Sequence, residues 1–228
     1  MCNMYSGEYV APILVVDSVV FQLINNQLSV LLIRRKTEPF KDKYALPGGY
    51  DAAGETTHDA MHRVLLVKAG VDTKKLKLVE QLYTFDTVAR DPRGHAVSVT
   101  YMGLGKDITP LETTSTQQPG FFPVDNLPQL AYDHENIIKY AHERLRSKVT
   151  YTNAVFALLD PLFTLSNLQV AYEAILGRPL DKRNFRKKFL SLELIQATDE
   201  YLQDGAHRPA RLYKFNKQNL ESLSRSFD

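Results

Sequence analysis

The residue types best suited to chemistry lie in one segment, residues 49–71, GYDAAGETTHDAMHRVLLVKAGV. An α-helix turns about 100° per residue, so Val64, Val67 and Lys68 would share one face of a helix here. Mg²⁺ requires hard oxygen ligands, and two valines and an ammonium provide none. We therefore expect no metal site on this face and no hydrolysis by metal-activated water. The charge of Lys68 instead favours a pocket that attracts a phosphate.

A substitute metal site is the alternative reading of the same segment. Its candidate ligands are Glu55, His58, Asp59 and His62. His58 and His62 stand four residues apart, which is ligand-like spacing, but the helical projection turns both away from the face of Val64. Solvent-facing polar residues on an amphipathic helix give the same pattern, and we favour that interpretation.

This segment resembles the signature of the Nudix family, G-x5-E-x7-R-E-U-x-E-E-x-G-U, where U is aliphatic. The fixed positions that match are Gly49, Glu55, Arg63, Leu65, Gly70 and Val71. In the family pattern, positions 64, 67 and 68 are the metal-binding glutamates, which this chain lacks. The resemblance implies a Nudix fold whose cleft binds a ligand without cutting it, so we expect a non-enzymatic domain with no cofactor. We expect Glu55 to pair with Arg63 and brace the loop-helix-loop.

Composition excludes several classes of protein. With 228 residues and 44% hydrophobic content, the chain can bury one large core or two ordinary ones. Its single cysteine, Cys2, rules out an internal disulfide framework and suits a reducing compartment. The apolar run over residues 10–24 is interrupted by Asp17, Ser18 and Gln22, lacks a basic leader and is too short for a membrane span. We expect a cytoplasmic protein with no membrane partner.

The elements that must position these residues fall into two modules. In the first, residues 1–147, apolar runs predict strands at residues 12–24, 28–33, 76–85 and 96–104, with a tight turn at Asn25-Asn26. Helices are predicted at residues 55–69 and 133–146, and the segment FFPVDNLP resembles the late strand and turn of Nudix domains. The predicted fold class is α+β: a Nudix fold, with a mixed sheet between helices, followed by a second domain.

That second module, residues 148–228, has the parts of a winged helix-turn-helix. Helical patterns are predicted at residues 152–159, 166–176 and 182–190, and strands at 194–201 and 211–215. Ser166 is the predicted N-cap of the second helix, Gly177 ends it, and Asp181 caps the third.

Basic residues concentrate in the same module, where residues 148–228 hold 12 Lys and Arg against 9 Asp and Glu. The third helix presents Phe185 and Phe189 on one side and cations on another, as a helix in a DNA major groove requires. A solvated charged face gives a similar pattern, but the basic tip of the predicted hairpin favours DNA. The predicted DNA-binding residues are Lys182, Arg183, Asn184, Arg186, Lys187, His207, Arg208 and Arg211.

Taken whole, residues 10–216 resemble Nudix-related transcriptional regulators, in which a Nudix domain senses a metabolite and a winged helix binds operator DNA. The pieces that carry the resemblance are YALPGGY, EQLYTFDTVARDPRGHAVSVTY, and FTLSNLQVAYEAILGRPLDKRNFRKKFL followed by HRPARLYKF. Members of the family include repressors of NAD biosynthesis genes that respond to ADP-ribose or related phosphates, and others that respond to pentoses such as arabinose. The resemblance implies a metabolite-responsive repressor, a homodimer on a two-fold symmetric operator.

Carry-over by position also points to residues that bind the effector, although each arginine taken alone is better explained by a surface ion pair. The predicted effector-binding residues are Arg34, Arg35, Tyr44, Gly48, Gly49, Lys68, Asp86, Arg90 and Arg93. Three alternatives stay open at this point: a pentose-responsive regulator, an active ADP-ribose pyrophosphatase, and a winged helix that binds protein rather than DNA.

Overall fold

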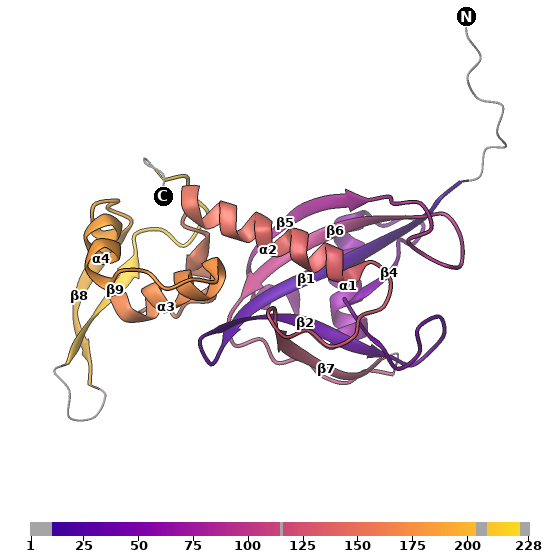
Figure 1. Ribbon diagram of the computed structural model, residues 1–228, viewed down its shortest axis with the longest axis horizontal. Helices are drawn as coiled ribbons and strands as arrows, with labels where there is room; N and C mark the ends of the chain where they lie inside the picture. The colour runs from indigo at the N-terminus through magenta and orange to yellow at the C-terminus, as the bar shows by residue number, and fades with distance from the viewer. Residues whose placement is uncertain (1–10, 115, 204–208, 224–228) are drawn as a thin grey trace, which may run out of the picture.

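The computed structural model describes residues 11–114, 116–203 and 209–223. Figure 1 shows two parts side by side, a sheet flanked by helices and a smaller helical part with a two-stranded hairpin, with one long helix running between them.

The first part is built on a mixed sheet, as the sequence predicts. Its strands are β1 (Ile13–Ile24), β2 (Gln27–Arg35), β3 (Tyr44–Ala45), β4 (Gly48–Tyr50), β5 (Leu76–Phe85), β6 (Ala96–Gly105) and β7 (Thr116–Pro123). The order is β3-β2-β1-β6-β5, with β4 also paired to β1 and β7 to β2. β1 runs parallel to β6 and antiparallel to β2. Asn25 and Asn26, with φ of 48° and 63°, form the predicted tight turn between β1 and β2.

Helices cover both faces of this sheet because β1 is apolar on both sides. Val16 and Val20 pack with α1 (Thr57–Ala69), whereas Val19 and Phe21 pack with α2 (His134–Tyr151). The two-residue period of a strand separates these pairs. The sheet is thereby held between two helices, and its edge near β4 is left to form a cavity.

The second part has the winged-helix elements. They are the 3₁₀ helix η2 (Ala154–Leu158), α3 (Leu165–Leu176), α4 (Lys182–Leu190), β8 (Ile195–Leu202) and β9 (Ala210–Phe215). Gly177 ends α3 with φ of 67°, and the Asp181 side chain accepts a hydrogen bond from the backbone N–H of Asn184, as predicted.

Two local predictions in this part are wrong. Thr164, not Ser166, caps α3: the side chains of Thr164 and Asn167 form a reciprocal capping box, which places the helix start two residues earlier than predicted. The segment predicted as a helix over residues 152–159 is the short 3₁₀ helix η2, all five of whose residues are buried. A fully buried segment has no exposed polar face to support a longer amphipathic helix.

The two parts share one hydrophobic cluster, which contains Phe21 of β1 and Phe189 of α4. Charged contacts reinforce this junction: Lys148 Nζ lies 2.7 Å from Glu80 Oε2, and Lys77 Nζ donates to the Leu159 carbonyl at 2.9 Å. The predicted boundary between residues 147 and 148 falls within α2, so no loop separates the modules there. Within the described ranges, none of the helices combines the length and apolar character needed to cross a bilayer.

Candidate ligand cavity and nucleic-acid interface

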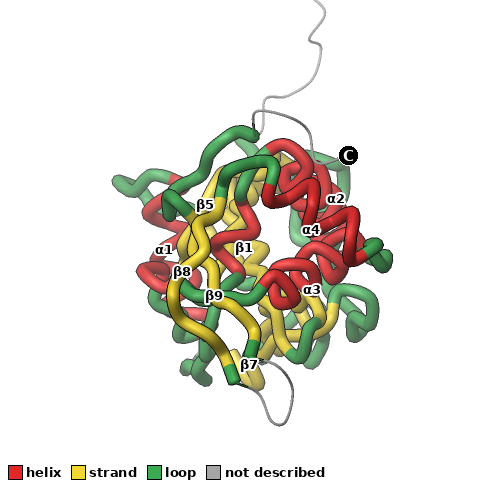
Figure 2. The backbone as a smooth tube through the Cα atoms, turned by 90° about the vertical axis from the view of Figure 1, so that its left-hand side faces the viewer, coloured by secondary structure: helices red, strands yellow, loops and turns green. Residues whose placement is uncertain are grey.

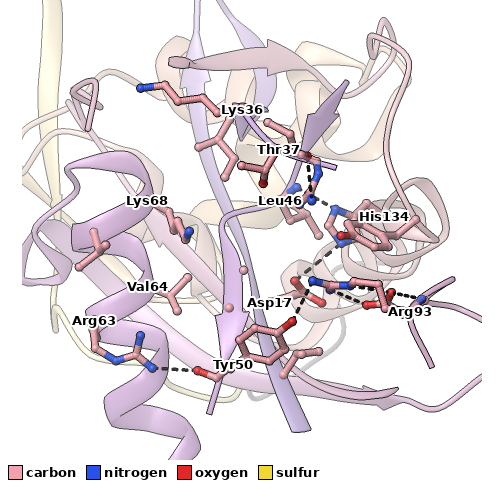
Figure 3. Close-up of a pocket in the computed structure, with 18 of the residues that line it drawn as sticks. Asp17, Lys36, Thr37, Leu46, Tyr50, Arg63, Val64, Lys68, Arg93 and His134 are labelled. Atoms are coloured by element: carbon pink, nitrogen blue, oxygen red, sulfur yellow. Dashed lines mark hydrogen bonds and ion pairs between the residues drawn. The ribbon is translucent and has the colours of Figure 1, made fainter. Parts of the chain in front are cut away.

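A cavity of about 490 Å³ lies between α1, β4 and the start of α2, which is within the range of ordinary small-molecule sites. Figure 3 shows Val64 and Lys68 of α1 on one side and Asp17, His134 and Arg93 on the other. Six cationic side chains and two carboxylates line this cavity. They are Arg35, Lys36, Arg63, Lys68, Arg90 and Arg93, with Asp17 and Asp91. Its lining is therefore strongly positive.

Both lining carboxylates are engaged by neighbours. Asp91 accepts hydrogen bonds from the Arg93 side chain at 3.0 and 2.6 Å, and these hold the pKa of Asp91 below its usual value. Asp17 Oδ2 accepts from Ser98 Oγ at 2.7 Å and lies 3.4 Å from Arg90. Neither carboxylate is left to offset the other cations.

A buried ion-pair network centred on Arg90 forms part of the cavity wall. Its guanidinium donates to both carboxylate oxygens of Asp133, at 3.0 and 2.8 Å, and to Asp17. His134 Nδ1 accepts from the backbone N–H of Leu46 at 2.9 Å, so the neutral ring carries its proton on Nε2, which lies 3.7 Å from Asp17 Oδ1. Burial lowers the pKa of His134, so this ring stays neutral.

Asp17 lies so close to the backbone of β4 that the residue at position 48 must be a glycine. A Cβ at position 48 would lie 2.0 Å from Asp17 Oδ1. Any side chain at that position would displace Asp17 from the network.

Aromatic rings and guanidiniums alternate at the far wall. Arg35 lies 5.0 Å and Arg93 5.8 Å from the centre of the Tyr132 ring, and Arg93 Nη1 donates to Tyr50 Oη at 2.8 Å. The Tyr132 hydroxyl is buried without a hydrogen-bond partner among the described residues. Such a group is a ready contact for a polar ligand.

Six of the nine predicted effector residues line the cavity, namely Arg35, Gly48, Gly49, Lys68, Arg90 and Arg93. Arg34, Tyr44 and Asp86 do not. Arg34 follows the alternation of β2 away from Arg35 and pairs with Asp42 at 3.2 Å; Tyr44 packs edge-on against Phe122 at 4.8 Å. Asp86 is exposed beyond the end of β5.

Other lining residues were missed by the sequence reasoning. Among them are Asp17, Lys36, Thr37, Tyr50, Tyr132 and His134. Asp17 had a signal, since it is a charged residue inside a long apolar run. Tyr132 and His134 had none, because they reach the cavity only through the way the start of α2 and the loop before it pack against the sheet.

The donor set does not fit the Mg²⁺ that a Nudix fold implies. Val64 is 1% exposed, and its Cγ2 would lie 3.1 Å from a Cβ on Gly49, so it fills the gap between α1 and β4. Glu55 is engaged by the side chain of Arg63 and by the backbone N–H of Ala52, as the predicted brace requires. In the described part of the chain, no three His, Cys, Asp or Glu residues are grouped for a metal.

The substitute metal site is not assembled either. Asp59 is used in the capping box of α1 with Thr56, and His62 Nδ1 contacts Thr73 Oγ1. His58 packs edge-on against His62, and none of these three side chains lines the cavity.

The second candidate site is the exposed face of α4. Phe185 and Phe189 are buried, whereas Lys182, Arg183, Asn184 and Lys187 are exposed. In Figure 2, which faces the winged part, α4 and the β8-β9 hairpin are both presented on the near side of the molecule. A basic helix beside a hairpin is the arrangement of winged-helix DNA-binding domains.

The remaining predicted DNA contacts differ in their surroundings. Arg186 is half-buried and donates to Ser166 Oγ at 3.2 Å, so it ties α4 to α3. Arg211 donates to the Thr198 carbonyl at 2.7 Å, within the hairpin. His207 and Arg208 lie outside the described residues.

Comparison with known protein families assigns both halves of the chain. The NUDIX domain family matches residues 14–142, and the family described as the NrtR DNA-binding winged helix domain matches residues 155–215.

Two curated relatives are similar to the chain. The "ADPR responsive transcriptional repressor NtrR" of Acinetobacter baylyi is 34% identical over 220 residues, covering 94% of this chain and 86% of that protein. The "ADP-ribose pyrophosphatase" of Methanocaldococcus jannaschii is 36% identical over 133 residues, covering 58% of this chain and 73% of that protein.

Solved structures of Shewanella oneidensis NrtR are also similar. The complex with a 27mer DNA has a TM-score of 0.78 and 30% identity, over 94% of this chain and 99% of that one. The NUDIX domain complexed with ADP ribose has a TM-score of 0.53 and 31% identity, over 63% of this chain and 94% of that one.

Proposed function

We propose, from the premise that this chain belongs to the family of Nudix regulators that carry an NrtR-type winged helix, that it is a transcriptional repressor controlled by ADP-ribose. The Nudix domain binds the effector, and the winged helix binds operator DNA. One observation carries the proposal: a strongly cationic cavity and an exposed basic helix lie in one chain whose two parts share a hydrophobic cluster.

The cavity suits the chemistry of ADP-ribose. Its diphosphate carries negative charge, for which the cations of α1 and β2 are complementary, and guanidinium and ammonium donors bind phosphate oxygens strongly. The Tyr50 and Tyr132 rings supply apolar surface for a base or a sugar, and the Tyr132 hydroxyl lacks a protein partner in the described structure. A neutral pentose would use the rings but leave the cations uncompensated, which disfavours the pentose-responsive alternative.

Operator binding is assigned to the exposed residues of α4. Arg183 and Asn184 at the start of the helix are of the types that pair with guanine and adenine edges, while Lys182 and Lys187 suit phosphates. Two copies of the chain, related by a two-fold axis, would place two such helices on a symmetric operator in the cytoplasm. ADP-ribose releases the operator if it favours the off-DNA arrangement, a coupling of typically about 1–3 kcal/mol.

Hydrolysis is not part of this proposal. The similarity to an ADP-ribose pyrophosphatase favours an enzyme as the second candidate, but the cavity face of α1 offers Val64, Val67 and Lys68 where a metal would need carboxylates. Incubation of the full chain with ADP-ribose and Mg²⁺ or Mn²⁺ tests this point. We expect no release of AMP; metal-dependent release of AMP by the parent chain would establish the enzyme instead.

An electrophoretic mobility shift tests the regulator directly. The full chain is incubated with DNA from upstream of its own gene, alone and with ADP-ribose, nicotinamide nucleotides, ribose phosphates or neutral pentoses. We expect a shifted band that ADP-ribose abolishes and neutral pentoses leave unchanged. A shift that no compound alters would refute the sensor role, and a chain that shifts no DNA would favour a protein-binding winged helix.

A further inference from the structure

We propose that Lys68 acts as a built-in counter-ion for the diphosphate, so that the cavity holds its ligand without any divalent cation. This inference rests on the proposed function, because it concerns how the same cavity binds ADP-ribose. It assigns to one side chain of α1 the charge-neutralising role that a bound metal plays in a phosphohydrolase.

Position supports the assignment. Val64, Val67 and Lys68 line the cavity together from one face of α1, and Figure 3 shows the Lys68 ammonium directed toward the cavity beside the apolar side chain of Val64. Val64 closes the gap against Gly49, and of Val64, Val67 and Lys68 it is Lys68 that brings a charge to the cavity. A lysine ammonium offers three donors on a flexible stem and can follow the phosphate oxygens.

The charges around Lys68 also favour a bound anion over a bound metal. Burial, and then the like charges of Arg35 and Arg63, lower the pKa of Lys68. The side chain therefore sits in a positive local field. A divalent cation entering this field would be repelled, whereas a diphosphate would relieve the repulsion among the three cations.

Both carboxylates among the described residues that line the cavity are already paired. Asp91 is held by Arg93, and Asp17 is held by Ser98 and Arg90. Glu55 lies outside the cavity lining and is committed to Arg63. To bind Asp17, Asp91 or Glu55, a metal would have to break a charge-assisted pair, while an anion needs to break none.

Calorimetric titration of the full chain with ADP-ribose, in EDTA and again in Mg²⁺, tests the inference. We expect equal affinity in the two buffers. Lys68→Met, which keeps the length of the side chain, should weaken binding by about tenfold or more in both buffers, since a hydrogen bond to a charged group is lost. Lys68→Arg should lose less than Lys68→Met, and Lys68→Glu should lose more.

Lys74→Met is the matched control, because Lys74 is an exposed lysine of the following turn that does not line the cavity. It should bind as the parent does, and thermal denaturation of each variant reports whether the fold is kept. Binding by the parent that requires Mg²⁺ would overturn the inference and leave the proposed function standing. Unchanged affinity in Lys68→Met would do the same. A parent chain that binds ADP-ribose in neither buffer would overturn the proposed function itself.

Discussion

Arg90 Nη2 lies 2.8 Å from Asp133 Oδ1, so the wall of the cavity is tied to the residue that immediately precedes helix α2. Asp133 is the N-cap residue of α2 but makes no side-chain capping hydrogen bond, because its carboxylate faces Arg90 instead. The start of this helix is thus held by an ion pair from the cavity wall rather than by its own cap.

Arg90→Met should destabilise the chain strongly. The change leaves the carboxylates of Asp133 and Asp17 without their partner, and breaking a buried pair in this way costs about 3–5 kcal/mol. Urea denaturation measures the free energy of unfolding. Arg178→Met, at an exposed arginine of the winged part, is the control and should change it little; an equally small effect of Arg90→Met would contradict the buried network.

Gly48→Ala should be more damaging than Gly49→Ala. At position 48 the new methyl would meet Asp17 Oδ1 at 2.0 Å, whereas at 49 it would meet only Val64 Cγ2, at 3.1 Å. Forcing an extra methyl into a packed site costs about 1–3 kcal/mol. We expect Gly48→Ala to show both a loss of stability and weaker ADP-ribose binding. The reverse order of the two variants would contradict the assigned contact with Asp17.

Stability should fall as the pH is lowered from 7 toward 5. Burial lowers the pKa values of His134 and His142 in the folded chain below the ordinary value of 6.5. The unfolded chain therefore takes up protons first, and the free energy of unfolding drops as the pH falls through about 6.5. His134→Asn, which keeps an acceptor for the Leu46 N–H, should flatten this dependence, leaving the share of His142. Denaturation at a series of pH values checks it, and an unchanged slope would count against a neutral buried His134.

Arg183→Ala and Lys187→Ala should each weaken operator binding. Where a phosphate contact is lost, the slope of log affinity against log salt concentration should also become shallower by about one unit. Fluorescence anisotropy over a range of salt concentrations measures both quantities. Lys139→Ala, at an exposed lysine of α2 in the Nudix part, should leave both unchanged; equal effects at all three positions would indicate nonspecific attraction to DNA.

The sequence predicted turns and helix ends best, because there the residue type itself determines the local backbone structure. The Asn25-Asn26 turn, the end of α3 at Gly177 and the cap of α4 at Asp181 were all predicted, because each depends on backbone conformation or on a neighbouring N–H. The error at Ser166 shows the limit of that rule. Thr164 can also cap a helix, although serine is the better cap in general, and the reciprocal bond to Asn167 decides between them.

The cavity was only partly predictable, because its walls meet through tertiary packing. Lys68 and Gly48 lie in a recognisable motif, but Tyr132 and His134, far along the sequence from that motif, come from the loop before α2 and from its first residue. Arg34 and Arg35 were predicted together, yet adjacent residues of a strand point to opposite faces. The sequence motif identified the segments that form the cavity, but it could not show which side chains of those segments point into it.

The length of helix α2 bears on how the two parts of the chain are connected. It begins beside the cavity and continues without interruption to Tyr151, at the entry of the winged part. At 1.5 Å per residue its 18 residues span about 27 Å. No loop interrupts α2 between the Nudix domain and the winged helix. A small tilt of the helix at His134 would therefore move its other end, at Tyr151, sideways, as a rigid lever does.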